Sequence, residues 1–60
     1  MQKEYVIVIN SINGLKTKNL ILNDNEITNL KSKLNSLNLQ ANDKSDRYMI
    51  IDNETKLGIL

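Results

Sequence analysis

The chain contains no cysteine and no histidine among its 60 residues. Without cysteine it cannot form a disulfide framework, a thiolate zinc site or a thiol nucleophile. Without histidine it lacks the usual proton shuttle at neutral pH and the commonest metal ligand. Its only glycines, Gly14 and Gly58, do not belong to a glycine-rich loop that could cradle a phosphate. We therefore expect no cofactor and no metal.

The side chains that remain are poorly suited to catalysis. The four serines have no histidine to activate them, and no lysine lies inside an apolar run that would remove its hydration. Paired carboxylates need a cleft, which a chain of about 60 residues rarely encloses. The acidic residues between positions 43 and 54 lack the spacing of a calcium loop. We expect that the protein is not an enzyme.

Length and composition indicate one small folded domain spanning residues 1–60. Hydrophobic residues make up 40% of the chain, too many aliphatic side chains for a disordered tail. No apolar run approaches the roughly 18 residues of a membrane span, and residues 1–4 enter a strand-like run without a cleavage site. We therefore expect a cytoplasmic protein without a membrane partner. The net charge of +1 gives no strong attraction to nucleic acid.

The first half of the chain predicts a β-hairpin. Tyr5–Ile9 is an unbroken run of β-branched and aromatic residues, which is a strong strand signal. Asn13-Gly14 is the pair favoured in a type I′ turn, because both central positions of that turn need a positive φ. A second strand should then run over Leu15–Leu22.

A two-residue Asn-Gly turn would set the register of this hairpin, with Ile7 opposite Leu20. In that register both faces of the hairpin are apolar, so both should be covered. The residues expected on one face are Tyr5, Ile7, Ile9, Leu20 and Leu22, and those on the other are Val6, Val8, Ile12, Leu15 and Ile21.

A helix should begin after Asn23. Asn23 is a good N-cap, and Glu26, three residues later, completes a capping-box pattern. One narrow apolar stripe follows at helical spacing, and we expect the helix to end near residues 38–39. The residues of the stripe are Ile27, Leu30, Leu34 and Leu37.

The last third of the chain predicts two more strands. A polar connector over residues 40–46 precedes a strand over Arg47–Ile51, and Asp52–Thr55 has the composition of a turn. A short strand over Lys56–Leu60 would follow. The expected fold is therefore α+β, a small β-β-α-β-β domain whose antiparallel sheet has one helix packed on one face.

A single helix cannot cover both faces of such a sheet, although the strands are apolar on both. A domain of this size without disulfide or metal is marginal, and oligomerisation is a common remedy. We therefore expect a homodimer or a higher oligomer, unless loops and chain ends fold back over the second face. The candidate self-association residues are Val6, Val8, Met49, Ile51, Leu57, Ile59 and Leu60.

The lysines suggest an alternative function. Lys16 and Lys18 lie on one face of the second strand, and Lys31 and Lys33 lie on the polar side of the helix. These residues could contact a protein partner or the phosphates of DNA, which would make the protein a small DNA-associated regulator. With two aromatic residues in the chain, platforms for base stacking are poor. Solvated lysines on exposed faces explain the same pattern.

The stretch Leu20–Leu30 passes directly from a strand into a capped helix, and ten Asn, seven Lys and eight Ile suggest an AT-rich genome. The layout of residues 5–37 resembles very short phage and prophage proteins in which a hairpin leads into one helix. That resemblance implies a stoichiometric inhibitor of a host protein, for instance of a defence system. We therefore expect a non-enzymatic binding module that associates with itself and blocks a host protein in the host cytoplasm. A structural subunit of a larger assembly is a further possibility.

Overall fold

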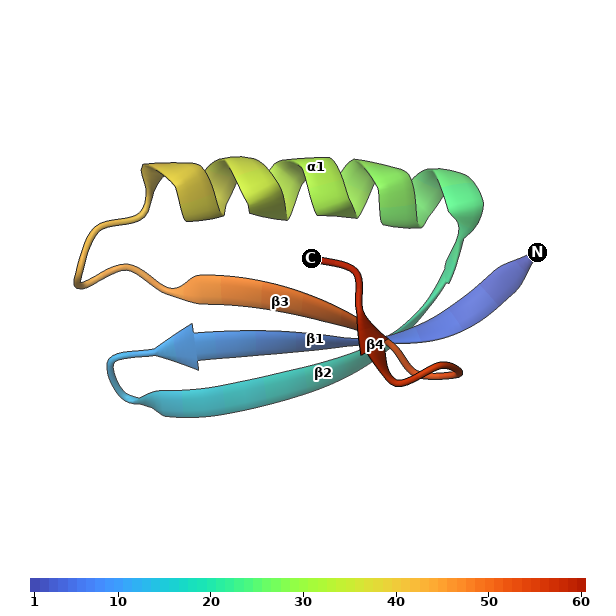
Figure 1. Ribbon diagram of the computed structural model, residues 1–60, viewed down its shortest axis with the longest axis horizontal. Coiled ribbons are helices and arrows are strands. Elements are labelled where there is room, and N and C mark those ends of the chain that lie inside the picture. The colour runs from blue at the N-terminus through green and yellow to red at the C-terminus, as the bar shows by residue number, and fades with distance from the viewer.

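The structure, a computed structural model, describes all residues from 1 to 60 and contains one helix and four strands. The elements are β1 (Gln2–Ser11), β2 (Gly14–Asn23), α1 (Asp24–Gln40), β3 (Arg47–Asp52) and β4 (Leu57–Gly58). They form one antiparallel sheet with the strand order β2-β1-β3-β4, and α1 lies on one side of it (Figure 1). The predicted β-β-α-β-β order and the α+β class are confirmed.

The core lies between α1 and one face of the sheet. Both β2 and β3 are antiparallel to β1, so they run parallel to each other, and α1 makes the crossover between them. The buried apolar side chains come from β1, β3 and α1, in keeping with the alternation along the strands. They are Tyr5, Ile7, Ile27, Leu34 and Ile50, and Ile50 is fully enclosed. Of the predicted helical stripe, Ile27 and Leu34 are buried, Leu30 is half-buried and Leu37 is 40% exposed.

The predicted turn and register of the hairpin are wrong. The two turn residues are Ile12 and Asn13, and Ile7 lies opposite Lys18, where the sequence predicted Leu20. Asn13 keeps a negative φ, whereas Gly14, which comes after the turn, has a φ of 129°. The turn is therefore not type I′, and its glycine serves as the residue that leads into β2.

The difference in register is two residues, which explains why burial did not reveal it. A shift of one residue would move every side chain to the other face, whereas a shift of two leaves each one on its face. The observed register pairs each of the ten residues of β1 with one of β2. It also brings Asn19 beside Glu4, where the amide donates a hydrogen bond of 2.8 Å to the carboxylate.

The start of the helix is as predicted. The Asn23 side chain accepts a hydrogen bond from the Glu26 backbone N–H at 2.8 Å, and the Glu26 carboxylate accepts one from the Asn23 N–H at 2.9 Å. The helix ends at Gln40, close to the expected position. In its last turn, the Asn38 amide donates to the Tyr48 carbonyl and accepts from the Tyr48 N–H, both at 2.9 Å. This side chain ties the end of α1 to β3.

The C-terminal segment is less regular than predicted. The strand expected over Lys56–Leu60 is reduced to β4, because Lys56 takes a left-handed conformation with a φ of 63° and turns the chain sharply. The turn is held by Asp52, whose carboxylate accepts hydrogen bonds from the backbone N–H groups of Glu54 and Thr55. Beyond β4, the Ile59 N–H donates to the Ile50 carbonyl at 2.8 Å.

Candidate functional site

The face of the sheet opposite α1 carries a cluster of apolar side chains and has nothing packed on it. Alternation along three strands brings its side chains together: Val6 lies opposite Ile51, and Val8 lies opposite Met49. We use the term open face for Val6, Val8, Leu15, Ile21, Met49 and Ile51. The two valines and Ile51 are half-buried by their neighbours, whereas Met49 is 49% and Ile21 64% exposed.

The structure divides the predicted self-association residues into two groups. Val6, Val8, Met49 and Ile51 lie together on the open face. Leu57, Ile59 and Leu60 do not join them. Ile59 and Leu60 pack against the core of their own chain, and Leu57 is exposed at the edge of the sheet.

Leu15 and Ile21 belong to the open face but were not among the candidate residues. The sequence contained the signal for both, because each follows the alternation that places it on the same side as Val6 and Val8. Polar residues also lie on this side of the sheet: Asn19 and Thr17 of β2 are directly opposite Val6 and Val8, and Glu4 and Arg47 lie toward its two ends. The apolar centre of the open face is therefore the β1–β3 cluster of Val6, Val8, Met49 and Ile51, with polar residues around it. An apolar centre with polar surroundings is the usual anatomy of a protein interface.

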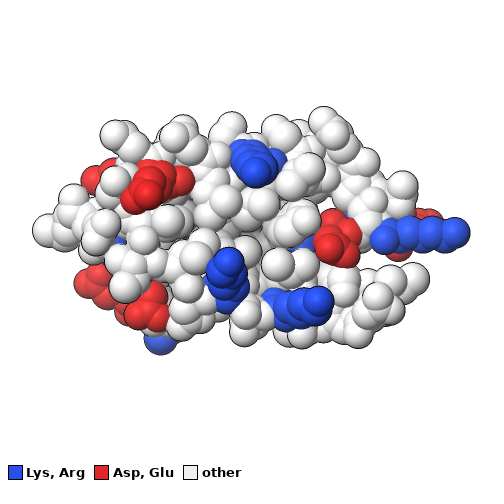
Figure 2. Space-filling model, turned by 180° about the vertical axis from the view of Figure 1, so that it is seen from behind, with Lys and Arg blue, Asp and Glu red and all other residues white.

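The four candidate lysines do not form one patch. Lys16 and Lys18 project from β2 on the helix side of the sheet, opposite Ile9 and Ile7, whereas Lys31 and Lys33 are exposed on α1. Figure 2 shows basic side chains separated by uncharged atoms, with the acidic side chains gathered toward the two ends of the molecule. Such an arrangement gives no continuous track for a phosphate backbone.

The closest group of charged side chains joins the start of β1 to the end of β3 and the turn that follows it. The Lys3 ammonium lies 3.1 Å from the buried Asp52 carboxylate and 3.7 Å from that of Glu54. The hydrogen bond from the Glu54 N–H and the one from Lys3 lower the pKa of Asp52, and the hydrogen bond to Asp52 raises the pKa of Lys3. Both groups are therefore held in their charged forms. Since the Asp52 carboxylate also organises the turn after β3, this cluster has a structural role.

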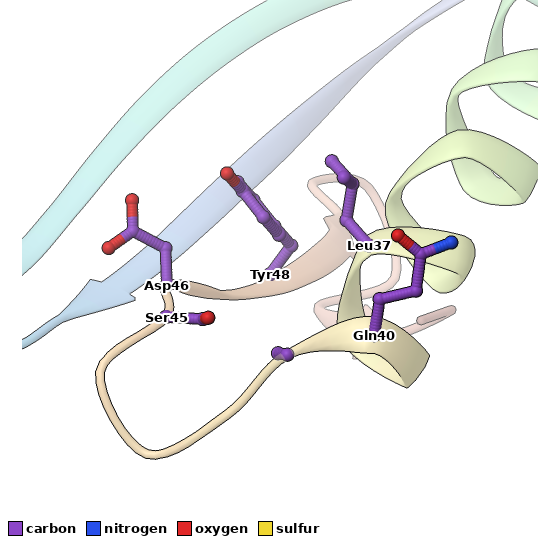
Figure 3. Close-up of a pocket in the computed structure, with 6 residues that line it drawn as sticks. Leu37, Gln40, Ser45, Asp46 and Tyr48 are labelled. Carbon is purple, nitrogen blue, oxygen red and sulfur yellow. The ribbon is translucent and has the colours of Figure 1, made fainter.

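An open hollow of about 440 Å³ lies where the end of α1 meets the start of β3. Figure 3 shows Leu37 and Gln40 of the helix on one side of it and Ser45, Asp46 and Tyr48 on the other. The hollow is lined by the carboxylate of Asp46 and the hydroxyls of Ser45 and Tyr48. The Ser45 hydroxyl bonds the Asn42 side chain and not the carboxylate, so the hollow offers no nucleophile–base pair. No group of three or more acidic side chains gathers anywhere in the chain in a way that could hold a metal ion.

No protein-family model, curated protein or solved structure matches this chain. No helix of the structure has both the length and the apolar character needed to cross a membrane. The geometry therefore supplies the functional argument, and its most developed feature is the open face.

Proposed function

We propose that the protein is a non-enzymatic binding module that pairs with a second copy of itself through the open face and blocks a larger protein by stoichiometric binding. The observation that carries this proposal is the open face itself. It sets Val6, Val8, Met49 and Ile51 side by side on the sheet, with Leu15 and Ile21 diagonal to the two valines, on the side away from the only helix. Contiguous apolar patches of this kind on small soluble proteins mark interaction sites.

The exposed surface of the chain supports pairing. A compact monomer of this mass is expected to expose about 4000 Å², whereas this chain exposes 4511 Å² and buries only six of its 60 residues. A stable interface needs about 800 Å² from each partner, which is less than a fifth of the exposed surface. The open face and the polar residues around it provide a continuous area for that contact.

A second copy fits this face by its chemistry. A twofold dimer brings the same patch of both subunits together, so an apolar sheet packs on an apolar sheet, as in a β-sandwich. The helices would then cover the two outer sides. The role as an inhibitor of a host protein follows from the resemblance to small phage proteins, and it needs only a complementary surface and no catalytic group.

Substitutions on the open face test the pairing. Val8→Lys should give a folded species with half the mass of the unmodified protein in gel filtration, because a charge would be placed at the centre of the interface. Leu39→Lys is the matched control, since Leu39 is an apolar residue of α1 that is 80% exposed and lies outside the open face. Equal elution of both variants and the unmodified protein would contradict pairing through this face.

A pull-down separates the inhibitor role from the DNA-associated alternative. Retention of one bacterial protein at high salt supports blocking of a protein target. Binding to DNA that weakens steeply with salt supports the regulator, because contacts with phosphates release counterions.

A further inference from the structure

The outer edge of β2 is unoccupied up to Asn23, whose N–H belongs to the helix cap. β2 is the first strand in the sheet order and pairs only with β1, without a bulge over its ten residues. Seven of these ten residues, including all from Gly14 to Asn19, are exposed. No proline interrupts the strand, and no other part of the chain pairs with its free side.

The opposite edge of the sheet is closed by the chain itself. The Asn38 side chain bonds both backbone groups of Tyr48. The Ile59 N–H bonds the Ile50 carbonyl at 2.8 Å, and the Lys56 N–H bonds the Asp52 carbonyl at 2.7 Å. Three separate devices therefore cover the outer side of β3, as proteins commonly do with exposed strand edges.

These contacts also show which backbone N–H and C=O groups of β2 face solvent. Because Tyr48 and Ile50 direct their backbone groups outward, their opposite residues on β1, Ile9 and Ile7, direct theirs toward β2. The partners of those two residues on β2 are Lys16 and Lys18, so their backbone groups are used within the hairpin. The backbone N–H and C=O groups that face solvent along the free edge are those of the alternate residues Leu15, Thr17, Asn19 and Ile21.

The charge along this edge has one sign. Lys16 and Lys18 are the only charged residues of β2, and both project on the helix side of the sheet. Neither side chain makes a hydrogen bond or ion pair within the chain, whereas that of Lys3 does both with Asp52. A strand added to this edge would place alternate side chains directly opposite the two lysines.

We propose that the free edge of β2 binds an extended acidic segment of the protein's target by β-strand addition. The backbone groups of Leu15, Thr17, Asn19 and Ile21 bond the added strand, and alternate carboxylates of that strand pair with Lys16 and Lys18. This inference rests on the proposed binding function and names the target-binding surface. A dimer formed through the open face leaves both β2 edges free.

A second copy of β2 is a poor occupant of the same edge. Antiparallel pairing of two β2 strands through the outward groups overlaps the most residues when it is centred on Lys18 or Asn19. The first register places the two Lys18 side chains directly opposite each other, and the second places them diagonally. Like charges at these positions disfavour pairing, and β2 has no acidic residue to offset them. An acidic segment has the complementary charge.

The test uses a soluble, end-blocked octapeptide of alternating threonine and glutamate, titrated at low salt. We expect binding to slow amide hydrogen exchange at Leu15, Thr17, Asn19 and Ile21. A peptide with glutamine in place of glutamate should bind about tenfold more weakly. Methylation of the threonine amides, which face β2 in this arrangement, should abolish binding, whereas methylation of the glutamate amides should leave it nearly unchanged.

Variants of the protein test both components of the interaction. Lys16→Glu with Lys18→Glu should weaken binding of the acidic peptide by about tenfold or more. Lys31→Glu with Lys33→Glu, which changes the net charge equally, should not. Thr17→Pro removes one outward N–H without breaking a bond to β1 and should weaken binding, whereas Thr17→Ala should not.

Several results would overturn strand addition. These are absence of peptide binding, equal effects of the two lysine pairs, or protection that appears on Val6 and Val8 instead of β2. Protection of β2 that rises with protein concentration in the absence of peptide would show that a second copy occupies the edge. Tighter binding of a short DNA duplex than of the peptide would show that the lysines serve a nucleic acid. A monomer that binds the peptide refutes only the dimer, whereas a dimer that does not bind it refutes only strand addition.

Discussion

Replacement of Asn38 by alanine should destabilise the protein more than its position near the end of a helix suggests. The Asn38 amide makes two hydrogen bonds of 2.9 Å with the backbone of Tyr48 and so closes the first part of the β3 edge. Each such bond contributes about 0.5–1.5 kcal/mol net. The higher helix propensity of alanine offsets roughly 0.6 kcal/mol of this loss in the free energy of unfolding. The expected net loss is about 1–2 kcal/mol.

That loss would be large for this chain. A domain of this length has a total stability of about 3–9 kcal/mol, and each kcal/mol changes the melting temperature by roughly 4–8 °C. Urea unfolding followed by circular dichroism gives the difference in free energy directly.

Asn35→Ala is the matched control for this experiment. Asn35 is an exposed asparagine of the same helix, so the substitution brings the same gain in helix propensity without the loss of the bonds to Tyr48. It should stabilise the protein by a few tenths of a kcal/mol or leave it unchanged. Equal effects of Asn35→Ala and Asn38→Ala would refute the assigned role of the amide.

Four further predictions use the same unfolding measurement. Asn23→Ala should cost ~1 kcal/mol, because it removes the side-chain acceptor of the capping box; a neutral result would contradict this role. Ile50→Ala should cost more, about 2–5 kcal/mol, because Ile50 is fully buried, and the reverse order of the two would show that the core is misplaced. Gly14→Val should destabilise the hairpin because its φ of 129° strains any other side chain; unchanged stability would contradict this turn. In the folded protein the pKa of Asp52 lies below its ordinary value of 3.8. The ionised carboxylate therefore stabilises the fold above pH 3.8, and this stabilisation should be lost as the pH falls through the folded pKa. Asp52→Asn should reduce this dependence on acid, and an unchanged pH profile would contradict the contribution of its charge.

The sequence predicted the features that depend on local patterns. Asn23 and Glu26 marked the start of α1, and alternation grouped Tyr5 with Ile7 on one face of the hairpin, which is the core face in the structure. The hairpin register was missed because Asn13-Gly14 favoured a turn one residue later, and both registers bury the same side chains.

Contacts between distant parts of the chain could not be predicted in this way. The bonds between Asn38 and Tyr48, and the packing of Ile59 against the core, depend on the path of the chain in space. The open face was anticipated through Val6, Val8, Met49 and Ile51, because alternation along a strand does not depend on the tertiary context. The exposed edge of β2 became apparent only with the strand order, since no local pattern shows which strand lies at the border of a sheet.

Sedimentation equilibrium of the unmodified protein, at several concentrations and in moderate salt, tests the central claim most directly. The claim is that the open face pairs with a second copy. It predicts a species of twice the 6.9 kDa chain mass that dissociates on dilution. A single species of 6.9 kDa at every concentration would contradict it.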